Sequence, residues 1–231
     1  MSDDRFDAIE AFIFDMDGVL TETSKQHFLA WRRLAQELGC DLPQSVMDEV
    51  RGISRRDSLN VVLESCGIAS KFDEAQKIAL ANQKNAYYLE SIDAFSEADL
   101  SDGALDLLSE LKRRGFLIGL ASASKNAPQL LKAMAIEHFF DAVVDPKAIN
   151  EGKPAPDIFI KAAELLHVNP ENCIGIEDAY AGIESIKAAG MTAYGIGSKE
   201  VLTNCDHVFH NLNELNASLA AISFQIKKTP T

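Results

Sequence analysis

The sequence lacks any run of about 18 apolar residues, the length needed to cross a membrane as a helix. Its start also lacks the basic residues and the apolar stretch of a signal peptide. Positive charge is scarce, because the sequence has 22 Lys and Arg residues and 35 Asp and Glu residues, which gives a formal net charge of −13. Such a chain repels nucleic acid and anionic membranes, so we expect neither as a partner. A phosphate-bearing ligand would therefore need local positive charge or a metal ion.

Paired cysteines are also missing from the sequence. The four cysteines are far apart and form no CxxC pair, so we expect neither a zinc site nor a disulfide framework. Reduced thiols and a cytoplasmic location fit this pattern best. With 231 residues and 47% hydrophobic content, the chain can bury a sizeable core, either in one domain or in one domain with a smaller insertion.

The most informative stretch is the apolar run 11–14, which is followed by Asp15, Asp17 and Gly18. The run is typical of a buried strand, and two acids at its carboxyl end stand where open α/β sheets bind ligands. Two such carboxylates could hold a hard cation, and one could attack phosphorus while the other handles protons. An ordinary turn is the alternative. A calcium loop is excluded, because an EF-hand needs Gly and Glu where Leu20 and Gln26 stand.

The order of expected helices and strands indicates an α/β fold. Helical spacing with helix start and stop residues continues from about residue 26 to 91, with Ser54 and Asp73 as expected N-caps. Helices and strands then alternate, which predicts a doubly wound parallel sheet. We expect further strands at 116–121, 142–144, 173–176 and 192–194, with helices at 103–114, 126–135, 156–167 and 179–189. The predicted domains are an α/β core, residues 1–24 and 93–231, and a small helical cap, residues 25–92, inserted after the first strand.

Three further polar clusters follow expected strands. The turn 122–126 offers hydroxyls, backbone N–H groups and a lysine beside a helix start, which suits phosphate, although such residues also serve as N-caps. Lys153 precedes a helix, where a surface lysine is the simpler interpretation. Glu177 and Asp178 form a second acid pair, although Asp178 could instead cap a helix. Because all these clusters lie at one edge of the predicted sheet, together they favour phosphoryl transfer at a magnesium site.

This ordered set resembles the four motifs of the haloacid dehalogenase superfamily, with the DxDG motif at Asp15–Gly18, then Ser122, then Lys153, then Glu177-Asp178. The resemblance covers nearly the whole chain. It extends to 17–23, to His27 and Trp31, and to 51–55 and 84–85 in the inserted region, and it continues at 121–126 and 153–159. In these stretches the sequence is similar to the β-phosphoglucomutase branch of the superfamily. Generic phosphatases of the superfamily share the four motifs without this inserted set.

The resemblance implies a role for each matching residue. Asp15 would be the nucleophile that becomes aspartyl-phosphate, and Asp17 the general acid and base. Mg²⁺ would be held by Asp15, the backbone carbonyl of Asp17, Glu177 and Asp178. The remaining sets are the binders of the transferring phosphate, Ser122, Ala123 and Lys153; the binders of the distal phosphate, Arg55, Ser124, Lys125 and Asn126; and the residues that couple cap and substrate, Thr23, His27, Gly52, Ser54 and Lys84. For Trp31 we expect a packing role.

The resemblance also implies an activity. We expect a cytoplasmic, Mg²⁺-dependent and monomeric mutase that interconverts β-D-glucose 1-phosphate and glucose 6-phosphate through a bisphosphate intermediate, with a small sugar phosphate as its only partner. The nearest alternative is a sugar-phosphate phosphatase with the same core. A non-catalytic sugar-phosphate sensor is a third interpretation, which the intact Asp15, Asp17 and Lys153 disfavour.

Overall fold

A computed structural model describes residues 8–221 and contains a six-stranded sheet in the order β3-β2-β1-β4-β5-β6. Every neighbouring pair of strands is parallel, so the predicted α/β class is confirmed. The strands are β1 (Ala11–Phe14), β2 (Leu117–Leu120), β3 (Ala142–Val143), β4 (Cys173–Glu177), β5 (Thr192–Ile196) and β6 (His207–Phe209). Strand β1 lies between β2 and β4, and the chain adds β2 and β3 on one side of β1 before it crosses to β4 on the other side. A crevice therefore opens at the carboxyl end of β1, where doubly wound sheets bind ligands.

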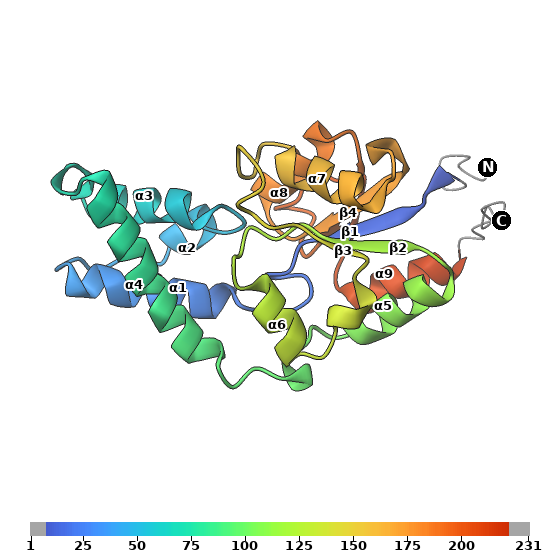
Figure 1. Ribbon diagram of the computed structural model, residues 1–231, viewed down its shortest axis with the longest axis horizontal. Coiled ribbons are helices and arrows are strands. Elements are labelled where there is room, and N and C mark those ends of the chain that lie inside the picture. Colours follow the sequence, from blue (N-terminus) through green and yellow to red (C-terminus); the bar gives the residue numbers. More distant parts are fainter. Residues whose placement is uncertain (1–7, 222–231) are drawn as a thin grey trace.

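Helices cover both faces of the sheet (Figure 1). On one face lie α7 (Asp157–Leu166) and α8 (Tyr180–Ala188), and on the other lie α5 (Ala104–Arg113), α6 (Ala127–Ala133) and α9 (Leu212–Ala221). Helices α5, α6, α7 and α8 lie in the connections between parallel strands, as the alternating pattern predicts, whereas α9 follows the last strand. Strand β6, helix α9 and the short helix α2 (Val46–Glu49) were not predicted.

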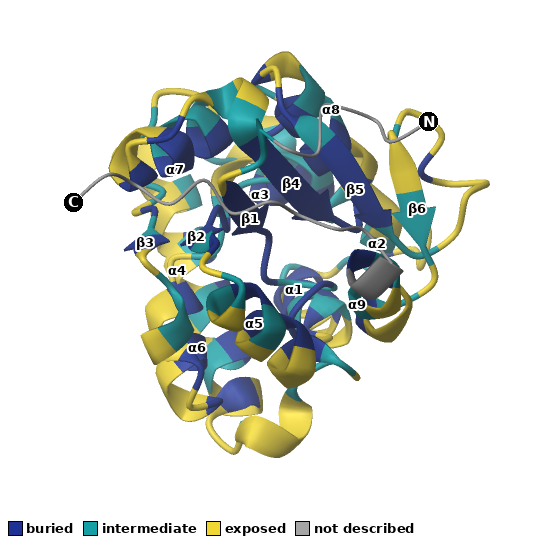
Figure 2. Ribbon diagram, turned by 90° about the vertical axis from the view of Figure 1, so that its right-hand side faces the viewer, coloured by how far each residue is buried: buried dark blue, intermediate teal, exposed yellow. Residues whose placement is uncertain are grey.

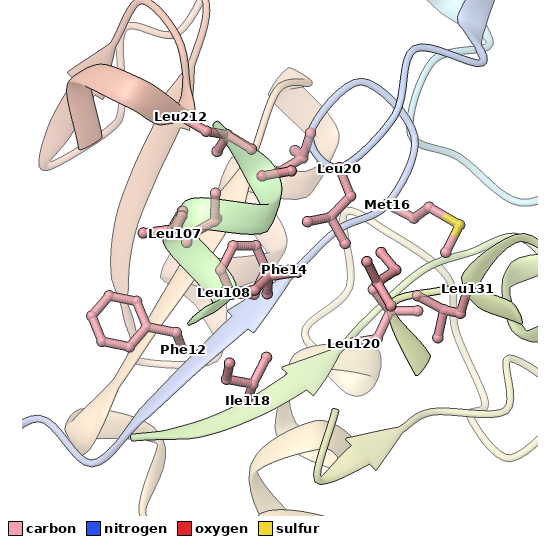
Figure 3. Packing of buried hydrophobic residues seen from close by; sticks show 14 of the residues in the cluster. Phe12, Phe14, Met16, Leu20, Leu107, Leu108, Ile118, Leu120, Leu131 and Leu212 are labelled. Carbon is pink, nitrogen blue, oxygen red and sulfur yellow. The ribbon is translucent and has the colours of Figure 1, made fainter. Parts of the chain in front are cut away.

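The two faces of β1 explain the double covering. Phe12 and Phe14 pack toward α5 and α9, whereas Ala11 and Ile13 pack toward α7 and α8. All four side chains are fully buried, and the central strands are buried along their length in Figure 2. Figure 3 shows the hydrophobic cluster around Phe12 and Phe14, which includes Leu107, Ile118 and Leu120. A central parallel strand buried on both faces reads as a continuous apolar run, which is the pattern of residues 11–14.

Residues 24–92 form a separate group of helices, which we call the inserted helices (Figure 1). They are α1 (Ser24–Glu37), α2, α3 (Arg55–Ser65) and α4 (Glu74–Ile92). Their facing sides form a hydrophobic cluster of their own, which includes Trp31, Leu34 and Val62. The expected N-caps are confirmed, because the Ser54 side chain accepts from the Asp57 N–H and the Asp73 side chain accepts from the Gln76 N–H. The division of the chain into two domains remains a prediction.

The two segments that join the inserted helices to the sheet lie side by side. Thr21 forms an isolated antiparallel bridge with Leu100, and its hydroxyl donates to the Asp99 carbonyl at 2.7 Å. The Ser101 N–H donates to the Leu20 carbonyl at 2.9 Å. Because both connections pass through this paired point, a movement of the inserted helices would pivot there.

One expectation about the cysteines is wrong. Cys40 and Cys66 form a disulfide, while Cys173 and Cys205 are free. Cys40 follows α1 and Cys66 ends α3, and packing of these helices brings the two Cα atoms to 5.8 Å. The residues are 26 positions apart and match no local motif, so only the tertiary fold could reveal the pair. The disulfide removes the support that four reduced thiols gave to a cytoplasmic location.

No helix among residues 8–221 is long and apolar enough to cross a membrane. Residues 1–7, on which the expectation about a signal peptide rests, lie outside the described part of the chain.

Candidate active site

Asp15 and Asp17 lie in a tight turn at the carboxyl end of β1. The Met16 carbonyl accepts from the N–H groups of Val19 and Leu20, and the Asp15 N–H donates to the Ile176 carbonyl of β4 at 2.9 Å. Gly18 has φ +86°, and a Cβ atom there would overlap the Asp178 carboxylate. The turn therefore needs glycine for both reasons, backbone conformation and close approach. A turn is thus present, as the alternative interpretation has it, but it also brings the first acid pair against the second.

The second acid pair ends the neighbouring strand β4. Glu177 and Asp178 are buried, and Glu177 Oε2 accepts from the N–H groups of Asp178 and Ala179 at 2.7 and 2.8 Å. Helix α8 has Ala179 at its N-cap, with no side-chain hydrogen bond. The capping interpretation of Asp178 is therefore wrong. Its carboxylate instead points toward the turn that follows β1.

Lys153 connects the two acid pairs. Its Nζ donates to Asp15 Oδ1 at 2.6 Å and to Glu177 Oε1 at 2.7 Å. The residue is only 3% exposed, so the interpretation as a surface lysine is wrong. The two nearby carboxylates outweigh the effect of burial and raise the pKa of Lys153, which keeps its ammonium group charged. The site therefore holds a permanent positive charge beside Asp15.

The acids still outnumber the cations at this site. Burial raises the pKa of Asp15 to about 7, and Lys153 only partly opposes that shift. Burial and the neighbouring Glu177 also raise the pKa of Asp178 well above its usual range. Raised values mean that the carboxylates repel one another and lack solvation. An additional cation would relieve both effects.

The carboxylates fit a hard metal ion. Asp15, Glu177 and Asp178 each offer an oxygen within 4.8 Å of the others. Asp178 Oδ1 is buried and has no hydrogen-bond partner within residues 8–221. Oxygen ligands of this kind suit Mg²⁺, and the unpartnered oxygen would gain a ligand. The Asp17 side chain is not part of this group, and the resemblance assigns its contact to the backbone carbonyl.

Asp17 faces the inserted helices rather than Lys153. Its Oδ1 accepts a hydrogen bond from the Thr23 hydroxyl and lies 3.8 Å from His27 Nε2. Burial favours the neutral acid, but the contacts with His27 and Thr23 together outweigh it and lower the pKa of Asp17. Asp15 and Asp17 therefore have environments that shift their pKa values in opposite directions. Such a divergence is typical of carboxylates with different roles in one active site.

Lys84 of α4 extends the contacts of Asp17. Its Nζ lies 2.7 Å from His27 Nδ1 and 4.6 Å from the centre of the Trp31 ring. Lys84 is 2% exposed, and burial together with the neighbouring Arg55 lowers its pKa to about 7. Burial and Lys84 also lower the pKa of His27. Lys84 and His27, both expected to couple cap and substrate, therefore form a chain of contacts that ends at Asp17. Trp31 packs in the core of the inserted helices, as expected.

The turn after β2 supplies hydroxyl and amide groups. Ser122 is buried beside the carboxyl end of β1, and its Oγ accepts from the Ser124 N–H at 3.1 Å. The hydroxyl proton of Ser122 has no acceptor within the described chain, so it is available to a ligand. Asn126 precedes α6 without capping it, and its Nδ2 donates to Asn85 Oδ1 of α4 at 2.9 Å. Asn126 therefore ties the turn to the inserted helices.

A pocket lies between the inserted helices and the sheet edge. Of the predicted site residues, it is lined by Asp15, Asp17, His27, Gly52, Arg55, Lys84, Ala123, Ser124 and Lys125. The others stand around this pocket: Thr23 contacts Asp17, and Ser54 lines a neighbouring opening together with Lys153. Gly52 has φ +75°, and a Cβ atom there would lie 3.0 Å from that of Ala179, so the loop closely approaches the start of α8.

Arg55 is a partly buried cation of this pocket without a carboxylate partner among the described residues. It is partly buried, and within residues 8–221 it makes no ion pair or hydrogen bond. Burial lowers its pKa, and no carboxylate compensates. The adjacent Arg56 is different, because its Nη2 bonds Glu74 Oε2 at 2.7 Å and its side chain is 77% exposed. The arrangement leaves a guanidinium free to bind an anion inside the pocket.

Arg51 is a site residue that the sequence analysis did not select. It also lines the pocket, and its Nη2 donates to Asp178 Oδ2. The residue stands in the stretch 51–55, which carries the resemblance, four positions before Arg55. Its contact with an acid 127 positions away has no local signal, so only the fold reveals it.

Residues 9–190 match a family model described as haloacid dehalogenase-like hydrolase. The chain belongs to this family. Over 211 residues it is 41% identical to a β-phosphoglucomutase of Bacillus subtilis, which covers 91% of this chain and 93% of that protein. A crystal structure of a β-phosphoglucomutase from Clostridium difficile has a TM-score of 0.89 and 41% identity, with 92% of this chain and 96% of that one covered. A phosphorylated carbohydrates phosphatase of Thermotoga maritima is 31% identical over 92% of this chain and 91% of that protein.

These similarities confirm the superfamily and the fold that the motifs predict. They make the chain an enzyme of a phosphotransferase and hydrolase class.

Proposed function

We propose that the protein is a Mg²⁺-dependent phosphomutase that interconverts β-D-glucose 1-phosphate and glucose 6-phosphate. The observation that carries this proposal is the unpaired Arg55 in the pocket that also contains Asp15. A mutase must hold the phosphate that is not reacting, and it must later exchange the two phosphates. A phosphatase has no such need, because water is its second substrate. Similarity to the two β-phosphoglucomutases supports the proposal.

Asp15 is the proposed nucleophile. Its carboxylate oxygen forms a bond to phosphorus, and the bond from phosphorus to the sugar oxygen breaks. Lys153 bonds Asp15 Oδ1, which leaves Oδ2 as the attacking atom. Ser122, the amide of Ala123 and Lys153 are the proposed donors to the oxygens of the phosphoryl group in transfer. The product on the enzyme is an aspartyl-phosphate.

Asp17 is the proposed acid and base. It gives a proton to the sugar oxygen that leaves phosphorus, and it takes a proton from the sugar hydroxyl that attacks the aspartyl-phosphate. Its contacts with Thr23 and His27 hold the carboxylate on the side of the inserted helices. Those contacts would make its position depend on that of the inserted helices.

The proposed metal ion is Mg²⁺, held by Asp15, Glu177, Asp178 and the backbone carbonyl of Asp17. When bound, it neutralises charge on the phosphoryl oxygens and on the carboxylates. The fit rests on the three converging acids and on the unpartnered Asp178 oxygen.

The proposed distal phosphate site consists of Arg55, Ser124, Lys125 and Asn126. Lys125 is exposed at the rim, whereas Arg55 is partly buried. We propose that residues 25–92 act as a cap that closes over the substrate and keeps water from the aspartyl-phosphate. A monomeric state and a cytoplasmic location remain predictions.

A sugar-phosphate phosphatase is the second candidate, because the relative from Thermotoga maritima is named as a phosphatase. A coupled assay for glucose 6-phosphate distinguishes the two activities. Purified protein with Mg²⁺ is given either β- or α-glucose 1-phosphate, with and without glucose 1,6-bisphosphate, while free phosphate is measured in parallel. We expect glucose 6-phosphate from the β anomer only, with a strong dependence on the bisphosphate. Stoichiometric free phosphate without glucose 6-phosphate would show a phosphatase. If neither product formed, the non-catalytic sensor would be the remaining interpretation.

A further inference from the structure

Arg51 links the inserted helices to the acids of the proposed metal site. It follows α2, and its Nη2 donates to Asp178 Oδ2, which belongs to the turn after β4. The Asp178 side chain is 2% exposed and that of Arg51 is 35% exposed. The ion pair is therefore shielded from water on the acid side, where charge interactions are strong.

The Arg51 guanidinium also lies close to the turn that follows β1. A Cβ atom on Gly18 would lie 3.1 Å from the same Nη2, so the guanidinium rests against the turn that carries Asp15 and Asp17. Within the described residues, two cations contact the three converging acids. Lys153 bonds Asp15 and Glu177, and Arg51 bonds Asp178.

Arg51 is also incompletely satisfied in this position. Its Nε is buried without a hydrogen-bond partner among residues 8–221, and so is Asp178 Oδ1. Both groups would gain from another ligand, the donor from an anion and the acceptor from a cation. An ion pair that leaves one polar atom of each partner unsatisfied is poorly suited to a purely structural role.

We infer that Arg51 is a positioning residue that couples the position of the inserted helices to the occupancy of the metal site. The inference rests on the proposed function, which includes Mg²⁺. A divalent ion bound to the Asp178 carboxylate repels the Arg51 guanidinium and competes with it for the carboxylate oxygens. Metal binding therefore weakens the Arg51–Asp178 contact. The coupling is reciprocal, and the contact therefore lowers the affinity for the metal by the same factor.

The coupling gives the two ligands an order. Without metal, Arg51 holds the inserted helices against the turn that follows β4, over the pocket. Metal binding releases Arg51 and favours opening, which admits the sugar phosphate. The substrate then supplies anionic oxygens to the released guanidinium, and the inserted helices close again on a complete site.

The test compares the wild type with Arg51→Ala and Arg51→Lys. Arg56→Ala is the matched control, because it removes the same charge five residues away from an exposed pair with Glu74. The dissociation constant for Mg²⁺ alone is measured by isothermal titration calorimetry. The radius of gyration is measured by small-angle X-ray scattering, with and without Mg²⁺.

We expect Arg51→Ala to bind Mg²⁺ about five- to twentyfold more tightly than the wild type, with Arg51→Lys in between and Arg56→Ala unchanged. Without Mg²⁺, Arg51→Ala should have a larger radius of gyration than the wild type. On addition of Mg²⁺, the radius of gyration should rise in the wild type, Arg51→Lys and Arg56→Ala, but not in Arg51→Ala.

Either of two results would overturn this inference without affecting the proposed function. One is an unchanged Mg²⁺ affinity in Arg51→Ala, and the other is tighter binding with unchanged scattering, which would show a local charge effect without coupling. If the wild type bound no Mg²⁺ at all, the metal dependence in the proposed function would be wrong, and the inference would fall with it.

Discussion

The ammonium nitrogen of Lys84 lies 2.7 Å from Nδ1 of His27, and both groups belong to the inserted helices. The contact leaves His27 Nε2 to face Asp17, 3.8 Å away. Lys84 is buried among the rings of Trp31 and Tyr88, so its charge is poorly solvated. A buried cation at this place is costly for the fold, and we expect its cost to be visible in stability measurements.

The first prediction concerns this cost. The pKa of Lys84 falls from 10.5 to about 7 on folding. Between these two pH values the unfolded chain binds a proton at Lys84 that the folded chain does not, so the free energy of unfolding rises with pH. Below about pH 7 both states are protonated, and the folded state carries the full cost of the buried ammonium group. We therefore expect Lys84→Met to be more stable than the wild type at neutral pH. The advantage should shrink by at most about 1.4 kcal/mol per pH unit between about pH 7.5 and 10.

Urea unfolding at several pH values measures this difference. Lys77→Met is the matched control, since Lys77 lies on the same helix but is only partly buried. A Lys84→Met advantage that does not change with pH, or that changes equally in Lys77→Met, would mean that the Lys84 ammonium group carries no such penalty.

The second prediction concerns the nucleophile. Asp15→Asn should lose all turnover, because an amide does not attack phosphorus effectively. Intact-protein mass spectrometry after incubation with acetyl phosphate and Mg²⁺ should show a phosphorylated wild type and an unmodified variant. Substantial activity in the purified variant would rule out the covalent route through Asp15.

The third prediction separates acid and base chemistry from binding. Asp17→Asn should still bind Mg²⁺ and sugar phosphate, since the proposed metal contact of Asp17 is through its backbone. Turnover should fall by about 10²–10⁴-fold, the usual contribution of a positioned proton donor. Calorimetric binding together with steady-state rates measures both effects. An unchanged rate would remove Asp17 from the role of acid and base.

The fourth prediction follows from the disulfide. Cys40 and Cys66 close a loop of 26 positions, which includes Arg51 and Arg55. Closing a loop of this length restricts the unfolded chain and should contribute about 3 kcal/mol. Dithiothreitol should therefore lower the free energy of unfolding by this amount. A Cys40→Ser/Cys66→Ser protein should be equally weakened and should no longer respond to the reductant. Identical stability of the wild type with and without dithiothreitol would mean that the bond does not stabilise the fold.

The sequence predicted the parts of the site that follow strands directly. Asp15, Asp17, Glu177 and Asp178 stand at the ends of apolar runs, and parallel pairing of β1 with β4 necessarily places those ends together. The helix starts at Ser54 and Asp73 were equally predictable, because capping is a local interaction.

Contacts between distant segments could not be predicted in this way. The ion pair of Arg51 with Asp178 and the disulfide depend on how the inserted helices pack, and no local residue pattern encodes that packing. The short strand β6 was missed because its three residues, His207–Phe209, are partly exposed at the edge of the sheet and carry a weak pattern.

The proposal of a mutase rests on Arg55, and one measurement tests it most directly. Mutase turnover of β-glucose 1-phosphate and phosphate release from acetyl phosphate are measured for the wild type, Arg55→Ala and the matched Arg56→Ala. Acetyl phosphate has no distal phosphate, so its hydrolysis does not need Arg55. We expect Arg55→Ala to lose at least about tenfold in mutase turnover, a fair value for a lost charged hydrogen bond, while its acetyl phosphate hydrolysis stays equal or rises. Arg56→Ala should retain both activities. If both activities of Arg55→Ala fell in parallel, or neither changed, Arg55 would not hold the distal phosphate and the case for a mutase would be contradicted.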